Sequence, residues 1–126
     1  MSPRASATAH ELSRIGLLAT LAGETIARLA ARMTREDVPP GKAIVSEGEV
    51  GDRFYVVLSG MLAVSQTARG ARGMLSPGDY FGEVGAAMGV PRTATVRALT
   101  PAVVASCDRA TFDEFLRPLF ADDEHG

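Results

Sequence analysis

One short segment of the chain carries residues that suit an anion. Gly82 and Gly85 have no Cβ, so a ligand can approach the backbone closely at both positions. Residues 83–88 can form a short helix that stops at Gly89, and free N–H groups at a helix start attract negative charge. Arg92 follows, with a guanidinium able to clamp a phosphate. These residue types at this spacing predict a phosphate-binding site.

A single carboxylate, Glu83, lies beside this predicted site. A carboxylate does not attract an anion, but it accepts hydrogen bonds from sugar hydroxyls, as acidic residues do in dinucleotide-binding folds. Phosphate donors next to a ribose acceptor indicate a nucleotide. Simpler interpretations stay open: the glycines as turn residues, Arg92 as a surface arginine, Glu83 as a charge at a helix start, and Thr93 as an ordinary strand residue.

The elements that must position these residues begin with two helices. Residues 10–33 have apolar positions three and four apart, as on one face of a helix, and Gly23 separates a short first helix from a second. The sequence Pro39-Pro40-Gly41 ends the helical pair.

Short apolar runs separated by turn residues follow, and they predict strands of an all-β body. The runs are 43–45, 54–58, 61–64, 93–98 and 102–107. Ser59-Gly60 indicates a tight hairpin. Asp108 and the capping-box pattern Thr111-Phe-Asp-Glu114 predict a final helix, which Pro118 is expected to end. The fold class is therefore mainly β with flanking helices: a β-sandwich or jelly-roll barrel with an N-terminal helical pair, a short helix at 83–88 and a C-terminal helix.

Length and composition bound the remaining possibilities. The 126 residues, 46% of them hydrophobic, suffice for one core, and we expect a flexible leader at 1–9, a domain at 10–117 and a short tail at 118–126. The net charge of −2 argues against a broad nucleic-acid surface. No apolar run approaches the ~20 residues that cross a bilayer, so we expect no membrane insertion and a cytoplasmic location. With one cysteine, Cys107, and two distant histidines, no metal centre or catalytic centre is predicted.

Two motifs in this sequence resemble the cyclic-nucleotide-binding domain family, which includes the catabolite activator protein, kinase regulatory subunits and the ligand domains of gated channels. The first motif is Phe81-Gly82-Glu83-Val84-Gly85, continued by Pro91-Arg92-Thr93-Ala94-Thr95-Val96-Arg97-Ala98, and it is similar to the family's phosphate-binding cassette. Upstream, residues 40–48 and 51–60 resemble the family's early strands. The likeness covers about residues 12–117.

The resemblance implies a non-catalytic sensor that binds a cyclic nucleotide and uses no cofactor. By this resemblance, Glu83 would accept a hydrogen bond from the ribose 2′-hydroxyl, and Arg92 would pair with the cyclic phosphate. Backbone N–H groups of Gly82, Val84, Gly85 and Ala94 would surround the phosphate and sugar, and Val64 and Leu75 would wall the pocket near the base. Thr93 lies where some members favour cGMP, yet cAMP-responsive members carry the same residue; cAMP is the expected ligand and cGMP the second choice.

The chain also departs from the family pattern. Ala86 and Ala87 are small where a bulky aliphatic side chain usually relays ligand binding to the C-terminal helices, and the helix that covers the base is expected to be truncated or absent. One alternative is therefore the same fold acting as a ligand-free interaction domain. A metal-dependent enzyme on a similar barrel lacks its histidine ligands here. A larger parent protein with an effector, channel or transporter domain stays open.

Overall fold

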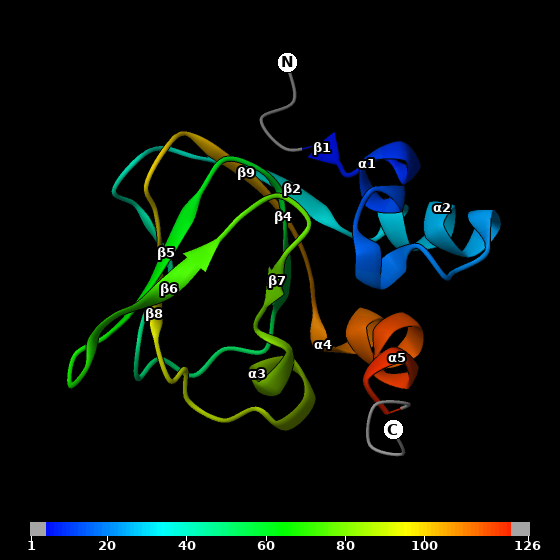
Figure 1. Ribbon diagram of the computed structural model, residues 1–126. Coiled ribbons are helices and arrows are strands. Elements are labelled where there is room, and N and C mark those ends of the chain that lie inside the picture. Colours follow the sequence, from blue (N-terminus) through cyan, green and yellow to red (C-terminus); the bar gives the residue numbers. More distant parts are fainter. Residues whose placement is uncertain (1–4, 122–126) are drawn as a thin grey trace.

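The computed structural model describes residues 5–121, which form two antiparallel sheets packed face to face with helices at one end (Figure 1). One sheet has five strands in the order β1-β2-β9-β4-β7, and the other has four in the order β3-β8-β5-β6. The strands are β1 (Ala5–Ser6), β2 (Thr34–Val38), β3 (Ala43–Val45), β4 (Phe54–Ser59), β5 (Leu62–Gln66), β6 (Gly70–Leu75), β7 (Tyr80–Phe81), β8 (Thr95–Ala98) and β9 (Ala102–Cys107).

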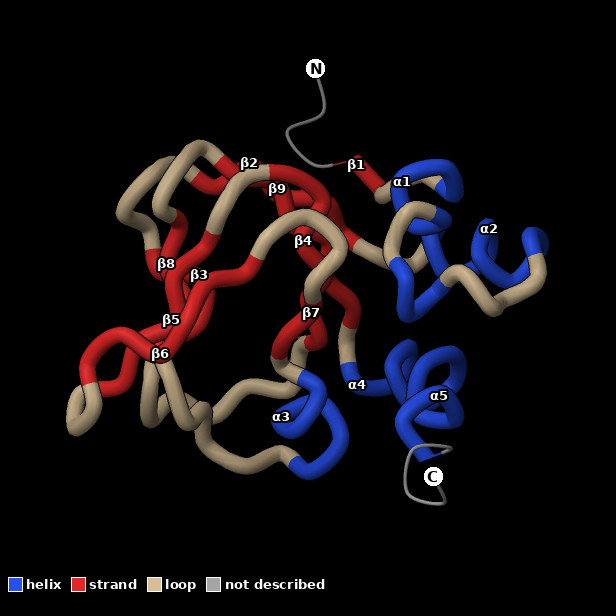
Figure 2. The backbone as a smooth tube through the Cα atoms, viewed as in Figure 1, coloured by secondary structure: helices blue, strands red, loops and turns tan. Residues whose placement is uncertain are grey.

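The helices are short and flank the five-stranded sheet. They are α1 (Ala9–Ser13), the 3₁₀ turn η1 (Gly16–Leu18), α2 (Gly23–Ala31), α3 (Glu83–Met88), α4 (Arg109–Thr111), the π-helical turn η2 (Phe112–Leu116) and α5 (Arg117–Ala121). In Figure 2, α3 lies between the strands and the helices α4 and α5. Within residues 5–121 no helix has the length and apolar character needed to cross a membrane.

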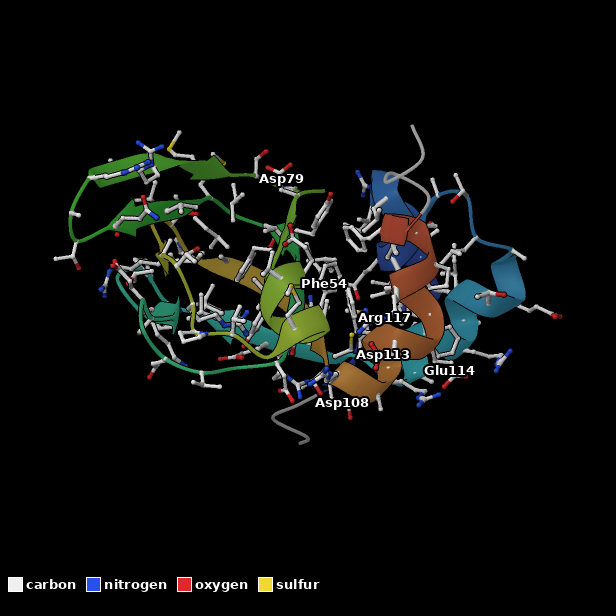
Figure 3. The ribbon with its side chains drawn as sticks, turned by 90° about the horizontal axis from the view of Figure 1, so that it is seen from below. Phe54, Asp79, Asp108, Asp113, Glu114 and Arg117 are labelled. Carbon is white, nitrogen blue, oxygen red and sulfur yellow. The ribbon has the colours of Figure 1, made fainter. Side chains whose placement is uncertain are left out.

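The alternation of side chains along β4 divides the core into two parts. Phe54 and Val56 point toward the helices, whereas Tyr55 and Val57 point into the space between the sheets, as expected for successive strand residues. Phe54 is fully buried, with its ring 5.4 Å from that of Phe112 on η2, so one strand packs the helices and the second sheet at once (Figure 3).

The predicted fold class is confirmed as a β-sandwich with flanking helices, but the two sheets do not close into a barrel. The expected hairpin at Ser59-Gly60 is wrong, because β4 and β5 belong to different sheets. Gly60 instead carries the chain across between the sheets with φ +84°, where a Cβ would lie 2.4 Å from the Pro101 carbonyl oxygen. Only glycine fits that crossing.

The described structure extends beyond the expected domain limits at both ends. Part of the predicted leader is folded: β1 pairs with β2, Ala7 is buried, and Thr8 caps α1 in a capping box with Glu11. The expectation that Pro118 ends the last helix is also wrong. Pro118 lies inside a continuous helical segment, directly after the π-helical turn Phe112–Leu116, and the chain stays helical to Ala121. Residues 1–4 of the leader and 122–126 of the tail lie outside the described residues.

The last helical segment begins at Asp108, as predicted, and Thr111 lies inside it instead of forming its own capping box. The Asp108 carboxylate accepts a hydrogen bond from the Thr111 N–H at 2.9 Å. That bond to the Thr111 backbone lowers the pKa of Asp108.

We expect Asp108→Ala to lower the free energy of unfolding at neutral pH by about 1 kcal/mol, the usual worth of an N-cap. Because the folded-state pKa is depressed, this stabilisation is present above the unfolded pKa and is lost as pH falls through the folded pKa. Urea titrations at pH 7 and in steps to pH 3 check this. Asp108→Asn, which keeps an acceptor, is the matched control; an equal loss in both variants would contradict the assignment.

Candidate functional site

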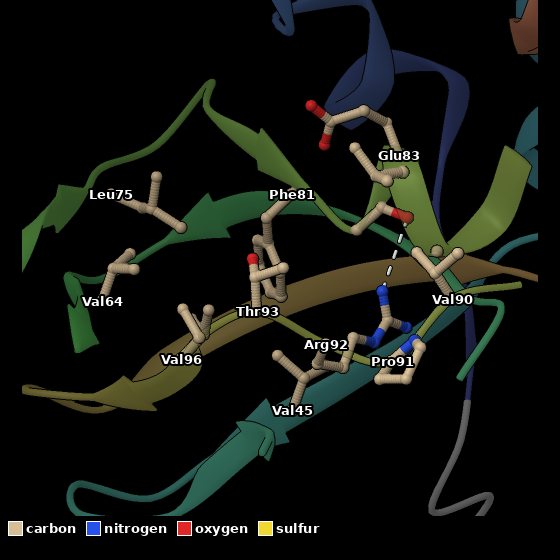
Figure 4. Close-up of a pocket in the computed structure, with 14 residues that line it drawn as sticks. Val45, Val64, Leu75, Phe81, Glu83, Val90, Pro91, Arg92, Thr93 and Val96 are labelled. Atoms are coloured by element: carbon tan, nitrogen blue, oxygen red, sulfur yellow. Dashed lines mark hydrogen bonds between the residues drawn. The ribbon is translucent and has the colours of Figure 1, made fainter. Parts of the chain in front are cut away.

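A cavity of about 260 Å³ opens between α3, the loop after it and the four-stranded sheet (Figure 4). All nine residues that the sequence singled out for ligand binding line this cavity. They are Val64, Leu75, Gly82, Glu83, Val84, Gly85, Arg92, Thr93 and Ala94. The structure therefore brings together residues that are up to 30 positions apart in the chain. The volume of the cavity lies just below the usual range for small-molecule sites, roughly 300–1,000 Å³.

The helix α3 is set by glycines at both of its ends. Gly82 begins it with φ +89° and Gly89 ends it with φ +67°, backbone conformations that favour glycine. The predicted helix from residue 83 to residue 88 is confirmed. No side chain caps its start, so the N–H groups of its first turn, at Glu83, Val84 and Gly85, remain available at the edge of the cavity.

The Arg92 side chain lies in a slot formed by three glycines. A Cβ on Gly51 would lie 3.1 Å from Arg92 Nη2, and a Cβ on Gly82 or Gly85 would lie 3.1 or 2.6 Å from Arg92 Nη1. Arg92 Nη2 donates to the Arg53 carbonyl oxygen at 3.0 Å, and Nη1 donates to that of Gly82 at 3.5 Å. Within the described range no carboxylate pairs with Arg92. Its charge thus has no counter-charge among the described residues.

The backbone of Arg92 is fixed as firmly as its side chain. The Arg92 N–H donates to the Glu49 carbonyl and the Gly48 N–H donates to the Arg92 carbonyl, both at 2.8 Å. Gln66 Nε2, on β5, donates to the carbonyl oxygen of the next residue, Thr93, at 2.9 Å. Thr93 and Ala94 precede β8 and belong to no strand, so these hydrogen bonds are what hold their loop in place.

Glu83 and Arg92 lie on different walls of the cavity and do not form an ion pair. In Figure 4 the Glu83 carboxylate points away from the guanidinium, and the dashed line from Arg92 ends on backbone. Glu83 is half-buried. An anion at Arg92 and a hydroxyl at Glu83 can therefore be held by one molecule that carries both groups.

The other end of the cavity is apolar. Val64 and Leu75 lie there, as Figure 4 shows, and the structure adds Val45, Phe81 and Val96. The Phe81 ring stacks on Tyr55 with centroids 4.8 Å apart. Burial raises the pKa of Tyr55, against the opposing charges of Arg92 and Arg53, so its hydroxyl stays neutral at physiological pH. This end of the cavity suits an apolar group.

The fold and the cavity define a β-sandwich domain whose pocket is polar at one end and apolar at the other. Residues 35–118, about two thirds of the chain, match the family profile described as cyclic nucleotide-binding domain. The chain belongs to the cyclic nucleotide-binding domain family.

Named relatives agree with this assignment. A cAMP-dependent protein kinase regulatory subunit from Debaryomyces hansenii is 38% identical over 107 residues, 85% of this chain and 24% of that protein. The regulatory domain of Toxoplasma gondii PKA with cAMP has a TM-score of 0.81 and 27% identity, over 88% of this chain and 44% of that one. The regulatory subunit of a cAMP-independent protein kinase A from Trypanosoma brucei has a TM-score of 0.84 and 25% identity, over 92% of this chain and 43% of that one. This chain spans about a quarter of the length of the curated relatives it matches.

Proposed function

We propose that this chain binds a cyclic nucleotide, with cAMP as the first choice, and acts as a non-catalytic regulatory domain. The single observation that supports this most is the Arg92 guanidinium, which lies in its glycine slot at the polar end of the cavity without a carboxylate partner in the described chain. A guanidinium held in this way can take a counter-charge, and a cyclic phosphate supplies one.

Each part of the ligand has a matching part of the cavity. The cyclic phosphate binds Arg92 and the N–H groups at the start of α3, and the ribose 2′-hydroxyl donates to Glu83. The base lies against Val64 and Leu75 at the apolar end. This order follows from the layout of the cavity, because the phosphate and ribose of a nucleotide are adjacent and the base is at the other end.

The choice of cAMP over cGMP rests on the relatives, several of which are named as cAMP-dependent. Among the described residues that line the cavity, Thr93 supplies the only side-chain hydroxyl, and none at the apolar end is charged. The Trypanosoma brucei relative, described as cAMP-independent, shares the fold, so the fold alone does not define the ligand. The residues of the cavity carry the proposal, and they count against a ligand-free role.

In a longer protein, occupancy of this site would be passed to an effector domain or partner chain through the helices that flank the five-stranded sheet. The relatives named as kinase regulatory subunits make a kinase the first partner to test. A cytoplasmic location fits such a role.

The role of Glu83 is tested by pairing a protein change with a ligand change. We expect Glu83→Gln to weaken cAMP binding by about 1.5–3 kcal/mol, roughly tenfold or more, because it removes a charged acceptor of the 2′-hydroxyl bond. Calorimetry with 2′-deoxy-cAMP should show the same loss for the parent chain and little further loss for the variant.

Glu24→Gln, an exposed carboxylate at the start of α2, is the matched control and should bind cAMP as the parent does. If 2′-deoxy-cAMP and cAMP bind the parent chain equally, Glu83 does not hold the sugar.

A further inference from the structure

Two arginines join the carbonyl end of α3 to the C-terminal helical segment, which comprises α4, η2 and α5 (residues 109–121). Arg109 Nη2 and Arg117 Nη2 each donate to the Ala87 carbonyl oxygen at 3.2 Å. The last four carbonyls of a helix have no partner within the helix, so the two guanidiniums satisfy an acceptor that α3 leaves free. Positive charge at that end also complements the dipole of the helix.

Arg117 is held in this orientation by its own surroundings. Its Nε and Nη2 donate to Asp113 Oδ1 at 2.9 and 2.6 Å, one turn earlier, and its guanidinium carbon lies 5.9 Å from the centre of the Phe112 ring. In Figure 3, Arg117 and Asp113 lie on the side of the segment that faces α3. Arg109 forms no ion pair within residues 5–121, so its bond to Ala87 is its main polar contact there.

The apolar contact between α3 and the same segment is small. Ala86 is the fully buried side chain of α3 and the half-buried Ala87 packs against the same core, so α3 contributes two methyl groups to the core around Phe112. The larger side chains of α3 point outward, with Val84 52% and Met88 68% exposed. The polar bonds to Ala87 therefore carry much of what fixes the direction of α3.

We propose that Arg109 and Arg117 are positioning residues for the nucleotide site, a role that rests on the function proposed above. They do not line the cavity. By holding the carbonyl end of a six-residue helix, they fix its N–H end and Glu83 against the cavity. The site thus depends on two guanidiniums of the C-terminal helical segment. In the family pattern, a bulky aliphatic side chain at the position of Ala86 or Ala87 would make this connection instead.

The test uses the double variant Arg109→Met/Arg117→Met, which keeps side-chain length and removes the donors. Amide hydrogen exchange at residues 86–89 of the nucleotide-free protein should become faster, and calorimetry should show cAMP affinity reduced about 2-fold to 30-fold. Arg109→Lys/Arg117→Lys should recover part of the affinity, because an ammonium also donates to a carbonyl. Arg28→Met is the matched control, since Arg28 lies near Glu114 and over Phe115 but does not contact α3.

The outcomes separate this inference from the proposed function. If the parent chain does not bind cAMP, the function fails, while faster exchange in the double variant still supports the contact with α3. Unchanged exchange together with parent affinity would overturn the positioning role. So would an equal loss of affinity in Arg28→Met. If circular dichroism shows the double variant unfolded, the single variants Arg109→Met and Arg117→Met decide by the same two measurements.

Discussion

Arg92→Ala should reduce cAMP affinity by about 2–5 kcal/mol, which corresponds to roughly 30-fold to several thousandfold. Among the described residues Arg92 is the only arginine that lines the cavity, and the variant removes its guanidinium. It also leaves the cyclic phosphate without its counter-charge in a partly desolvated site. Arg92→Lys should lose less, because it keeps the charge but not the planar fork that matches two phosphate oxygens. Isothermal titration calorimetry at fixed ionic strength measures both.

Arg97→Ala is the matched control for this prediction. Arg97 lies five residues along the same segment, is exposed on β8 and donates to the Gly41 carbonyl at 2.8 Å. Its loss changes the net charge by the same amount without touching the cavity. Parent affinity in Arg92→Ala, or an equal loss in Arg97→Ala, would show that Arg92 is not the phosphate ligand.

Gly85→Ala should lower the free energy of unfolding by about 1–3 kcal/mol, the usual cost of overpacking, and weaken cAMP binding as well, although alanine is the better helix former. Gly85 lies inside α3, and a Cβ there would be 2.6 Å from Arg92 Nη1 and 2.7 Å from the Gly51 carbonyl oxygen. The Gly51 carbonyl oxygen is part of the backbone and cannot move without displacing its neighbours, so the guanidinium and the start of α3 must move apart. Calorimetry and thermal unfolding together measure the change in affinity and in stability.

Gly23→Ala provides the control for a helical glycine with free space. Gly23 begins α2, and no atom lies within 4 Å of the position of an added Cβ. That variant should bind cAMP normally and be as stable as the parent or more so. If Gly85→Ala also binds normally and gains stability, the slot around Arg92 is not as tight as the distances indicate.

The strands that sequence patterns predicted are those with apolar runs, and the strands that they missed have none. β2 has the sequence Thr-Arg-Glu-Asp-Val, in which only Val38 is buried, so its own pattern does not predict a strand. It is a strand because it pairs with β9 along its whole length. β6 contains Gly70 and Gly73, which are typical of turns, yet it pairs with β5 along its length. Whether β2 and β6 form strands therefore depends on the strands they pair with and not on their own residues.

The crossing at Gly60 shows the same limit for topology. A glycine between two apolar runs predicts a hairpin locally, but β4 pairs with β9, more than 40 residues later. Burial of Val57 and Leu62 between two sheets requires the chain to change sheets there. Only long-range packing decides between those outcomes.

The polar end of the site was more predictable than the apolar end. Glycines, Glu83 and Arg92 lie within eleven residues, so local chemistry and one motif indicate them all. Val45 and Val96 come from β3 and β8, and in the sequence they are ordinary core valines. Their membership of the cavity follows only from the pairing of those two strands, which places Val45 opposite Val96.

A direct comparison of cAMP with adenosine tests most closely whether this cavity recognises a cyclic phosphate. Adenosine keeps the base and the 2′-hydroxyl but lacks the phosphate, so calorimetry of the two ligands on the parent chain and on Arg92→Ala isolates the phosphate contact. We predict that the parent binds cAMP one-to-one and at least about 30-fold more tightly than adenosine, and that this gap nearly closes in Arg92→Ala. Equal affinity of the parent for both ligands, or no binding of cAMP, would contradict the proposed function.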